Sequence, residues 1–85
     1  MPKEKANKLL HQLRTEIEQQ ASLPDSDKQR MGKLVEDIEQ GLNEDNISDE
    51  LNNKLADTVT EFEATHPRLT AIINDIMITL SNMGI

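Results

Sequence analysis

The two histidines are the side chains in this sequence best suited to chemistry near neutral pH. Histidine can act there as a base, a metal ligand or a pH sensor. His66 directly precedes Pro67, and His11 lies on the polar side of an amphipathic stretch. No His-Glu-x-x-His pattern or other short spacing joins them, which is unfavourable for a zinc site. We therefore expect no metal and no cofactor, and we interpret His66 as a capping or half-buried residue at a helix junction. Binding of a small ligand or a metal there is the alternative.

Carboxylates form the second candidate group. The segment from Glu36 to Glu50 contains seven acidic residues and no lysine or arginine, namely Glu36, Asp37, Glu39, Glu44, Asp45, Asp49 and Glu50. Such a run could attract a hard cation or a basic protein, but it lacks the glycine and the closing glutamate of a calcium loop. Acid–base catalysis by paired carboxylates needs a pocket that raises one pKa, and this is the most polar part of the chain. We expect a solvated acidic loop, and no enzyme.

Any such group must be positioned by a small and acidic chain. The sequence has 85 residues, with 16 acidic and 9 basic side chains, a net charge of -7, one aromatic residue and no cysteine. Its length indicates a single domain spanning residues 1–85. The lack of cysteine favours the cytoplasm, and the acidic balance is unfavourable for binding nucleic acid. No apolar run is long enough to span a membrane, so we expect no membrane association.

The apolar residues recur with a helical period throughout the chain, and no strand-like alternation is present. This pattern predicts an all-α, up-and-down bundle of three or four helices, over residues 2–21, 26–42, 49–65 and 67–83. Leu23 and Pro24 separate the first two helices, because a residue before proline avoids helical geometry. Ser26 and Gln29 match a capping box for the second helix, and Ser48 is placed to cap the third.

The apolar seam of the last two helices continues through Pro67 without losing phase. Its members step by four and three residues along Phe62, His66, Leu69, Ile73, Ile76, Leu80 and Met83. This spacing predicts that the last two helices are nearly continuous, with a kink or a close junction at Pro67.

The C-terminal stretch carries an unusually broad apolar arc, and Ile78 lies outside it. A chain of this size gains core most simply by meeting a second copy, so we expect a homodimer through this seam. The predicted interaction residues are Phe62, Leu69, Ile73, Ile76 and Leu80, and the rest of the predicted core is Leu10, Leu13, Ile17, Leu34 and Ile38. The alternative is that the arc belongs to the core of a monomeric bundle.

Two C-terminal motifs carry a family resemblance. They are the Phe62-Glu63-Ala64-Thr65-His66-Pro67-Arg68-Leu69-Thr70 block and the closing Met83-Gly84-Ile85. With the leucine pattern of the first helix, they resemble a family of short, helical bacterial proteins classed as a domain of unknown function. The resemblance spans nearly the whole chain. It implies a compact helical cytoplasmic protein and assigns no catalytic or ligand-binding residues.

The function that these observations favour is a non-catalytic, homo-oligomeric protein-interaction module. Residues 44–85 contain eight acidic side chains against Lys54 and Arg68, which suggests a basic protein as a possible partner. A second hypothesis is an acidic regulator that mimics nucleic acid and thereby binds a basic protein. It predicts carboxylates spaced along one helical face at phosphate-like intervals.

Overall fold

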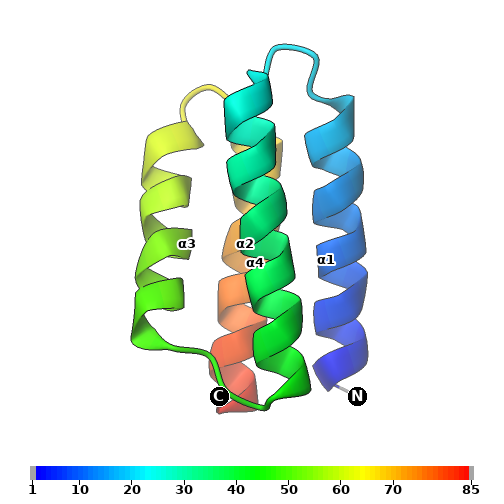
Figure 1. The fold of residues 1–85 in the computed structure, drawn as a ribbon, viewed down its shortest axis with the longest axis vertical. Coiled ribbons are helices and arrows are strands. Elements are labelled where there is room, and N and C mark those ends of the chain that lie inside the picture. Colours follow the sequence, from blue (N-terminus) through cyan, green and yellow to red (C-terminus); the bar gives the residue numbers. More distant parts are fainter. Residues whose placement is uncertain (1, 85) are drawn as a thin grey trace.

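The computed structural model describes residues 2–84, which fold into four helices. They are α1 (Pro2–Gln19), α2 (Asp25–Asn43), α3 (Asp49–Phe62) and α4 (Pro67–Met83). The helices run alternately up and down, and α1 and α3 each pack beside α2 and α4 (Figure 1). No strand occurs within residues 2–84. The predicted all-α, up-and-down bundle is confirmed, with four helices.

The first connection differs from the prediction at both of its ends. α1 ends at Gln19 rather than residue 21, and a turn follows in which the Leu23 amide donates to the Gln20 carbonyl at 3.1 Å. α2 begins at Asp25 with Pro24 as its N-cap residue, and no side chain caps it. The predicted Ser26 capping box is therefore wrong. Pro24 is already extended, at φ -59° and ψ 150°, and its carbonyl accepts from the Lys28 amide, so Ser26 lies inside the first turn.

The second connection is held by a close backbone approach and a side-chain cap. The Asn46 amide donates to the Gly41 carbonyl at 2.9 Å, so the chain folds back against the end of α2. A Cβ atom at Gly41 would lie 2.8 Å from the Asn46 carbonyl oxygen and would also collide with Ile47. The Ser48 hydroxyl then accepts from the Leu51 amide at 3.1 Å, which confirms the predicted cap of α3.

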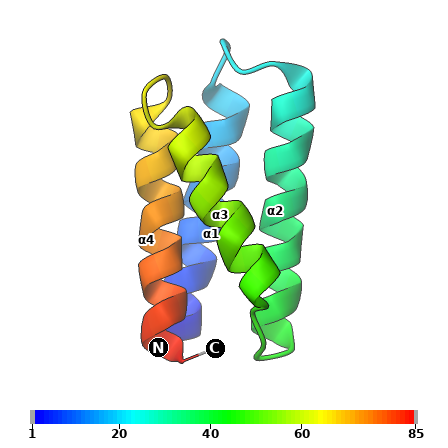
Figure 2. The same cartoon turned by 90° about the vertical axis from the view of Figure 1, so that its left-hand side faces the viewer.

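The third connection reverses the chain, so the predicted near-continuity of the last two helices is wrong. α3 ends at Phe62, whose carbonyl accepts from the amides of Thr65 and His66 at 3.2 and 2.8 Å. His66 adopts φ -135° and ψ 66°, outside the helical region that a residue before proline avoids. Pro67 then begins α4 antiparallel to α3 (Figure 2). The spacing of the apolar residues indicates which residues are buried. It does not indicate whether the chain continues or reverses at the junction.

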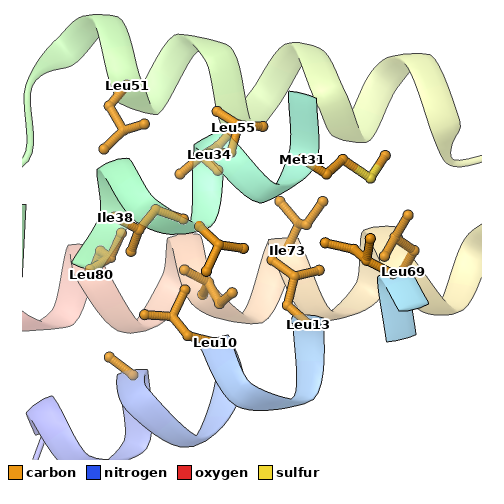
Figure 3. Packing of buried hydrophobic residues seen from close by; sticks show 14 of the residues in the cluster. Leu10, Leu13, Met31, Leu34, Ile38, Leu51, Leu55, Leu69, Ile73 and Leu80 are labelled. Atoms are coloured by element: carbon orange, nitrogen blue, oxygen red, sulfur yellow. The ribbon is translucent and has the colours of Figure 1, made fainter. Parts of the chain in front are cut away.

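All four helices contribute to one core (Figure 3). The residues predicted to complete the core are buried, namely Leu10, Leu13, Ile17, Leu34 and Ile38. The five predicted interaction residues lie in the same core, with exposed fractions of 7% for Phe62, 0% for Leu69 and Ile76, and 1% for Ile73 and Leu80. The C-terminal arc is thus covered by the chain's own helices. None of the described helices has the length and apolarity needed to cross a membrane.

Candidate interaction surface

His66 joins two turns at the same end of the bundle. Its Nε2 atom lies 3.3 Å from the Ser22 hydroxyl and its Nδ1 atom 3.1 Å from the Thr65 hydroxyl. The His66 and Phe62 rings are nearly perpendicular, with their centroids 6.0 Å apart. The His66 carbonyl, rather than its ring, caps α4 by accepting from the Thr70 amide at 3.1 Å. The ring of His66 therefore connects the α1–α2 turn to the α3–α4 turn.

A buried carboxylate that the sequence did not single out lies near this end. Glu16 is 7% exposed and accepts a hydrogen bond from the Gln20 side chain at 2.8 Å. The Arg68 guanidinium approaches the same carboxylate at 3.8 Å from α4, although the Arg68 side chain is largely exposed. Glu16 lies seven residues after the half-buried Leu9, on the flank of α1 that meets α4. Its burial arises from a neighbouring helix, which local spacing did not reveal.

The charged side of α3 faces α2. Glu50, Lys54, Asp57 and Glu61 are spaced by four, three and four residues and so form one helical stripe. Arg30 of α2 reaches this stripe, with its guanidinium 2.6 Å from the Glu61 carboxylate. Lys54 pairs within the stripe, 3.6 Å from Glu50. The stripe therefore combines both signs of charge and is partly neutralised by its own neighbours.

A groove follows this boundary between α2 and α3. It encloses about 260 Å³, and Leu34 and Thr58 contribute the buried part of its lining. Its other lining residues bring three cations and three anions together, namely Arg30, Lys33 and Lys54 with Asp37, Asp57 and Glu61. In Figure 2, α3 leans away from α2 toward its C-terminal end, where Arg30 bridges the two helices. The groove presents no net charge to a ligand.

The predicted acidic loop lies at the opposite end of the bundle from His66. Glu44, Asp45, Asp49 and Glu50 are exposed there. Lys3 of α1 lies 2.9 Å from Asp45, and Lys54 is the partner of Glu50. No group of three histidine, aspartate or glutamate side chains within residues 2–84 lies close enough to hold a metal ion. Half of this acidic cluster is already paired within the chain.

The outer side of α4 carries few charged side chains. Ile78 is 52% exposed, the largest exposure of any bulky apolar side chain in the described part of the chain. Its exposed neighbours one turn away are Asn74, Asp75, Ser81 and Asn82, with Ala71 one further turn toward the N-terminus. Asp75 is the only charged side chain of α4 beyond Arg68.

A second stripe lies on α3, with charge only at its two ends. Asn52, Ala56 and Val59 are spaced by four and three residues, on the flank of α3 opposite the Glu61 side that meets α2. The exposed Asp49 and Glu63 continue this spacing at its two ends. This flank is therefore turned toward α4, and α3 and α4 lie side by side in both views of the fold (Figures 1 and 2). We call the two stripes together the α3–α4 face; its residues are Asn52, Ala56, Val59, Ala71, Asn74, Asp75, Ile78, Ser81 and Asn82.

The α3–α4 face was not among the sequence-predicted interaction residues. The signal that could have identified it is Ile78, an apolar residue out of phase with the buried arc of α4. A residue in phase with the arc is buried by its own chain, whereas a residue out of phase is left for solvent or a partner.

Comparison with known protein families shows which family the chain belongs to. The family model described as a domain of unknown function, DUF4404, matches residues 7–85. The chain belongs to the DUF4404 family. The matched region includes most of α1, all of the other three helices and the whole α3–α4 face. No curated protein and no solved structure matches the chain.

Proposed function

We propose that the protein is a small, non-catalytic protein-interaction module that self-associates through the α3–α4 face. The observation that supports this proposal is the exposed Ile78 in an almost uncharged surround, on a chain in which 29% of residues are charged. Depletion of charge at the centre of a patch, more than its bulk apolarity, distinguishes an interface from other protein surface. A single exposed isoleucine would be unremarkable without that surround.

The charge of the chain limits which of its surfaces could meet a second copy. Two copies each carry a net charge of -7, so they repel one another at most approaches. Contact through the α3–α4 face brings only Asp75 near the interface centre, with Asp49 and Glu63 at its edge, whereas contact through the acidic loop would add several like charges. α4 is about 25 Å long at 1.5 Å per residue, so a contact made by this helix alone would be smaller than the roughly 800 Å² per partner of a standard interface. Self-association is therefore reversible and depends on concentration.

Light scattering after size exclusion, at several protein concentrations, tests this proposal. We expect the mass of the wild type to rise toward that of a dimer, and Ile78→Glu to remain a monomer because it would bury a carboxylate without a partner. Gln29→Glu adds the same charge at an exposed position of α2 and is the matched control. It should behave like the wild type. An unchanged association of Ile78→Glu, or a wild type that is monomeric throughout, would overturn the proposal.

The other sequence-derived functions receive less support. A basic protein would find two of the four carboxylates at the acidic end already paired with Lys3 and Lys54. For nucleic-acid mimicry, the acidic stripe of α3 is interrupted by Lys54 and bound by Arg30, which breaks a phosphate-like series. At the His66 junction, both ring nitrogens already face hydroxyl groups of the chain. We take the cytoplasm as the location, because a chain without cysteine needs no oxidising compartment.

A further inference from the structure

We infer that the bundle opens at the boundary between α2 and α3, and that Arg30 is the clasp that holds this boundary closed. The helices pack as four neighbouring pairs, and of these α2 and α3 make the least extensive contact. The most extensive contact joins α1 and α4, on the opposite side of the bundle. The α1–α2 and α3–α4 hairpins are therefore joined firmly along one side and weakly along the other. This inference does not depend on self-association.

The two ends of the α2–α3 boundary differ. At one end, residues 44–48 connect the two helices covalently. Toward the other end α3 leans away from α2, and the Arg30 side chain bridges the two helices there (Figure 2). The contact between Ser22 and His66 joins the two hairpins at this same end. Separation of α2 and α3 is thus limited by the chain connection and is easiest at the end where Arg30 lies.

Arg30 provides the polar link across this boundary. Its guanidinium lies 2.6 Å from the Glu61 carboxylate and 5.4 Å from the centroid of the Phe62 ring. Within residues 2–84, no other ion pair or side-chain hydrogen bond joins α2 to α3. An exposed ion pair and a cation–π contact each contribute only modestly to stability. Such a clasp can therefore break and re-form while the rest of the bundle stays folded.

The remaining charges along the groove do not close it. Asp37 and Lys54 both line the groove, and each lies two turns from the residues of the clasp on its own helix. Lys54 pairs with Glu50 of its own helix, so it forms no bridge to α2. A groove of about 260 Å³ remains between the two helices. Beyond the clasp, the boundary is held only by packing, and such elements open below the free energy of global unfolding.

Two buried threonines allow the opening to be measured, because the natural sequence contains no cysteine. Thr58 lines the α2–α3 groove, and Thr79 lies three turns after Arg68, on the flank of α4 that meets α1. Both are 5% exposed. Their hydroxyls donate to the carbonyls of Lys54 and Asp75, at 2.7 and 2.9 Å. Thr58→Cys and Thr79→Cys are therefore matched in burial and in local bonding, and they differ in the boundary that covers them.

The rate at which iodoacetamide labels each thiol in the dilute, native chain tests the inference. With each rate divided by that of the same variant unfolded in urea, we expect Thr58→Cys to react at least about ten-fold faster than Thr79→Cys. Global unfolding exposes both thiols together, and their exposure in the closed bundle is the same. Neither route produces a difference between the two variants. Equal rates would overturn the inference.

The role of Arg30 is tested in the Thr58→Cys background. Arg30→Gln should raise the labelling rate about three- to ten-fold, because it removes the ion pair and the cation–π contact. Loss of a nearby cation would by itself disfavour the reactive thiolate and slow the reaction, so a rise reports opening. Arg14→Gln is the matched control, since the Arg14–Glu39 pair joins α1 to α2 and stays intact when α2 and α3 separate. It should leave the rate unchanged. No rise with Arg30→Gln, or an equal rise with both changes, would overturn the assignment of Arg30 as the clasp.

Discussion

The Nε2 atom of His66 lies 3.3 Å from the hydroxyl oxygen of Ser22, which precedes it by 44 residues. This contact links the α1–α2 turn to the α3–α4 turn at the end of the bundle away from the termini (Figure 1). Through this contact His66 connects two turns of the bundle, a role that neither helical spacing nor the adjacent proline indicates. The ring also holds Thr65 and contacts Phe62, so it fixes the turn that reverses the chain.

A double-mutant cycle measures the His66–Ser22 link. We expect His66→Ala to lower the free energy of unfolding by about 1–2 kcal/mol, since it removes a hydrogen bond and the edge contact with Phe62. Ser22→Ala should cost about 0.5–1 kcal/mol, and the coupling between the two changes should be of similar size to the Ser22→Ala effect. Urea unfolding of the four proteins gives these values. Additive effects would mean that the two turns are not connected through this pair.

The two helical glycines of α2 should respond in opposite directions to the same substitution. Gly41→Ala should destabilise by about 1–3 kcal/mol, because the new methyl group would meet the Asn46 carbonyl and the Ile47 side chain. Gly32→Ala has open space around the new Cβ and should stabilise by roughly 0.5–1 kcal/mol through helix propensity. Thermal unfolding followed by circular dichroism compares them. A stabilising Gly41→Ala would refute the close approach at the α2–α3 turn.

The two serines that resemble helix caps should also differ. Ser48→Ala should cost about 1 kcal/mol, because the Leu51 amide loses its acceptor. Ser26→Ala should change the stability by less than about 0.5 kcal/mol, since Ser26 lies inside the first turn of α2 and caps nothing. Equal losses of stability for the two variants would mean that Ser26 caps α2, in contrast to the structure, in which Pro24 is the N-cap residue.

Salt should strengthen self-association through the α3–α4 face. The two chains repel each other through their net charges of -7, and added sodium chloride screens that repulsion. The face itself contains Asp75 and no cation, so it has no interfacial ion pair that added salt could weaken. The dissociation constant measured by sedimentation should therefore fall between low and moderate salt. A constant that rises with salt would indicate an interface held by opposite charges instead.

The sequence predicted the helical class and the buried residues well, and limited the number of helices to three or four, because burial at helical spacing is a local property of the chain. Leu10, Leu34 and Ile76 lie in the core, where their spacing placed them. Chain direction at Pro67 was not predictable from phase, since an antiparallel hairpin and a kinked helix bury the same positions. The reversal depends on the backbone conformation of His66 and on the hydrogen bond that its amide donates to the Phe62 carbonyl.

The candidate site was harder to predict because it depends on what the other helices cover. The broad arc of α4 suggested surplus apolar surface, but α1 and α3 flank this helix and bury Leu69, Ile73 and Leu80 within one chain. Ile78 remains outside because none of the four described helices covers that side. Glu16 is buried for the same tertiary reason, beside a helix more than fifty residues later in the sequence.

The central claim is that the wild-type chain self-associates, and sedimentation equilibrium across a wide range of concentration tests it most directly. The account predicts an average mass that approaches the chain mass at low concentration and rises toward twice that value at high concentration, with one monomer–dimer constant describing all the data. A mass equal to that of a single chain at every concentration would contradict it.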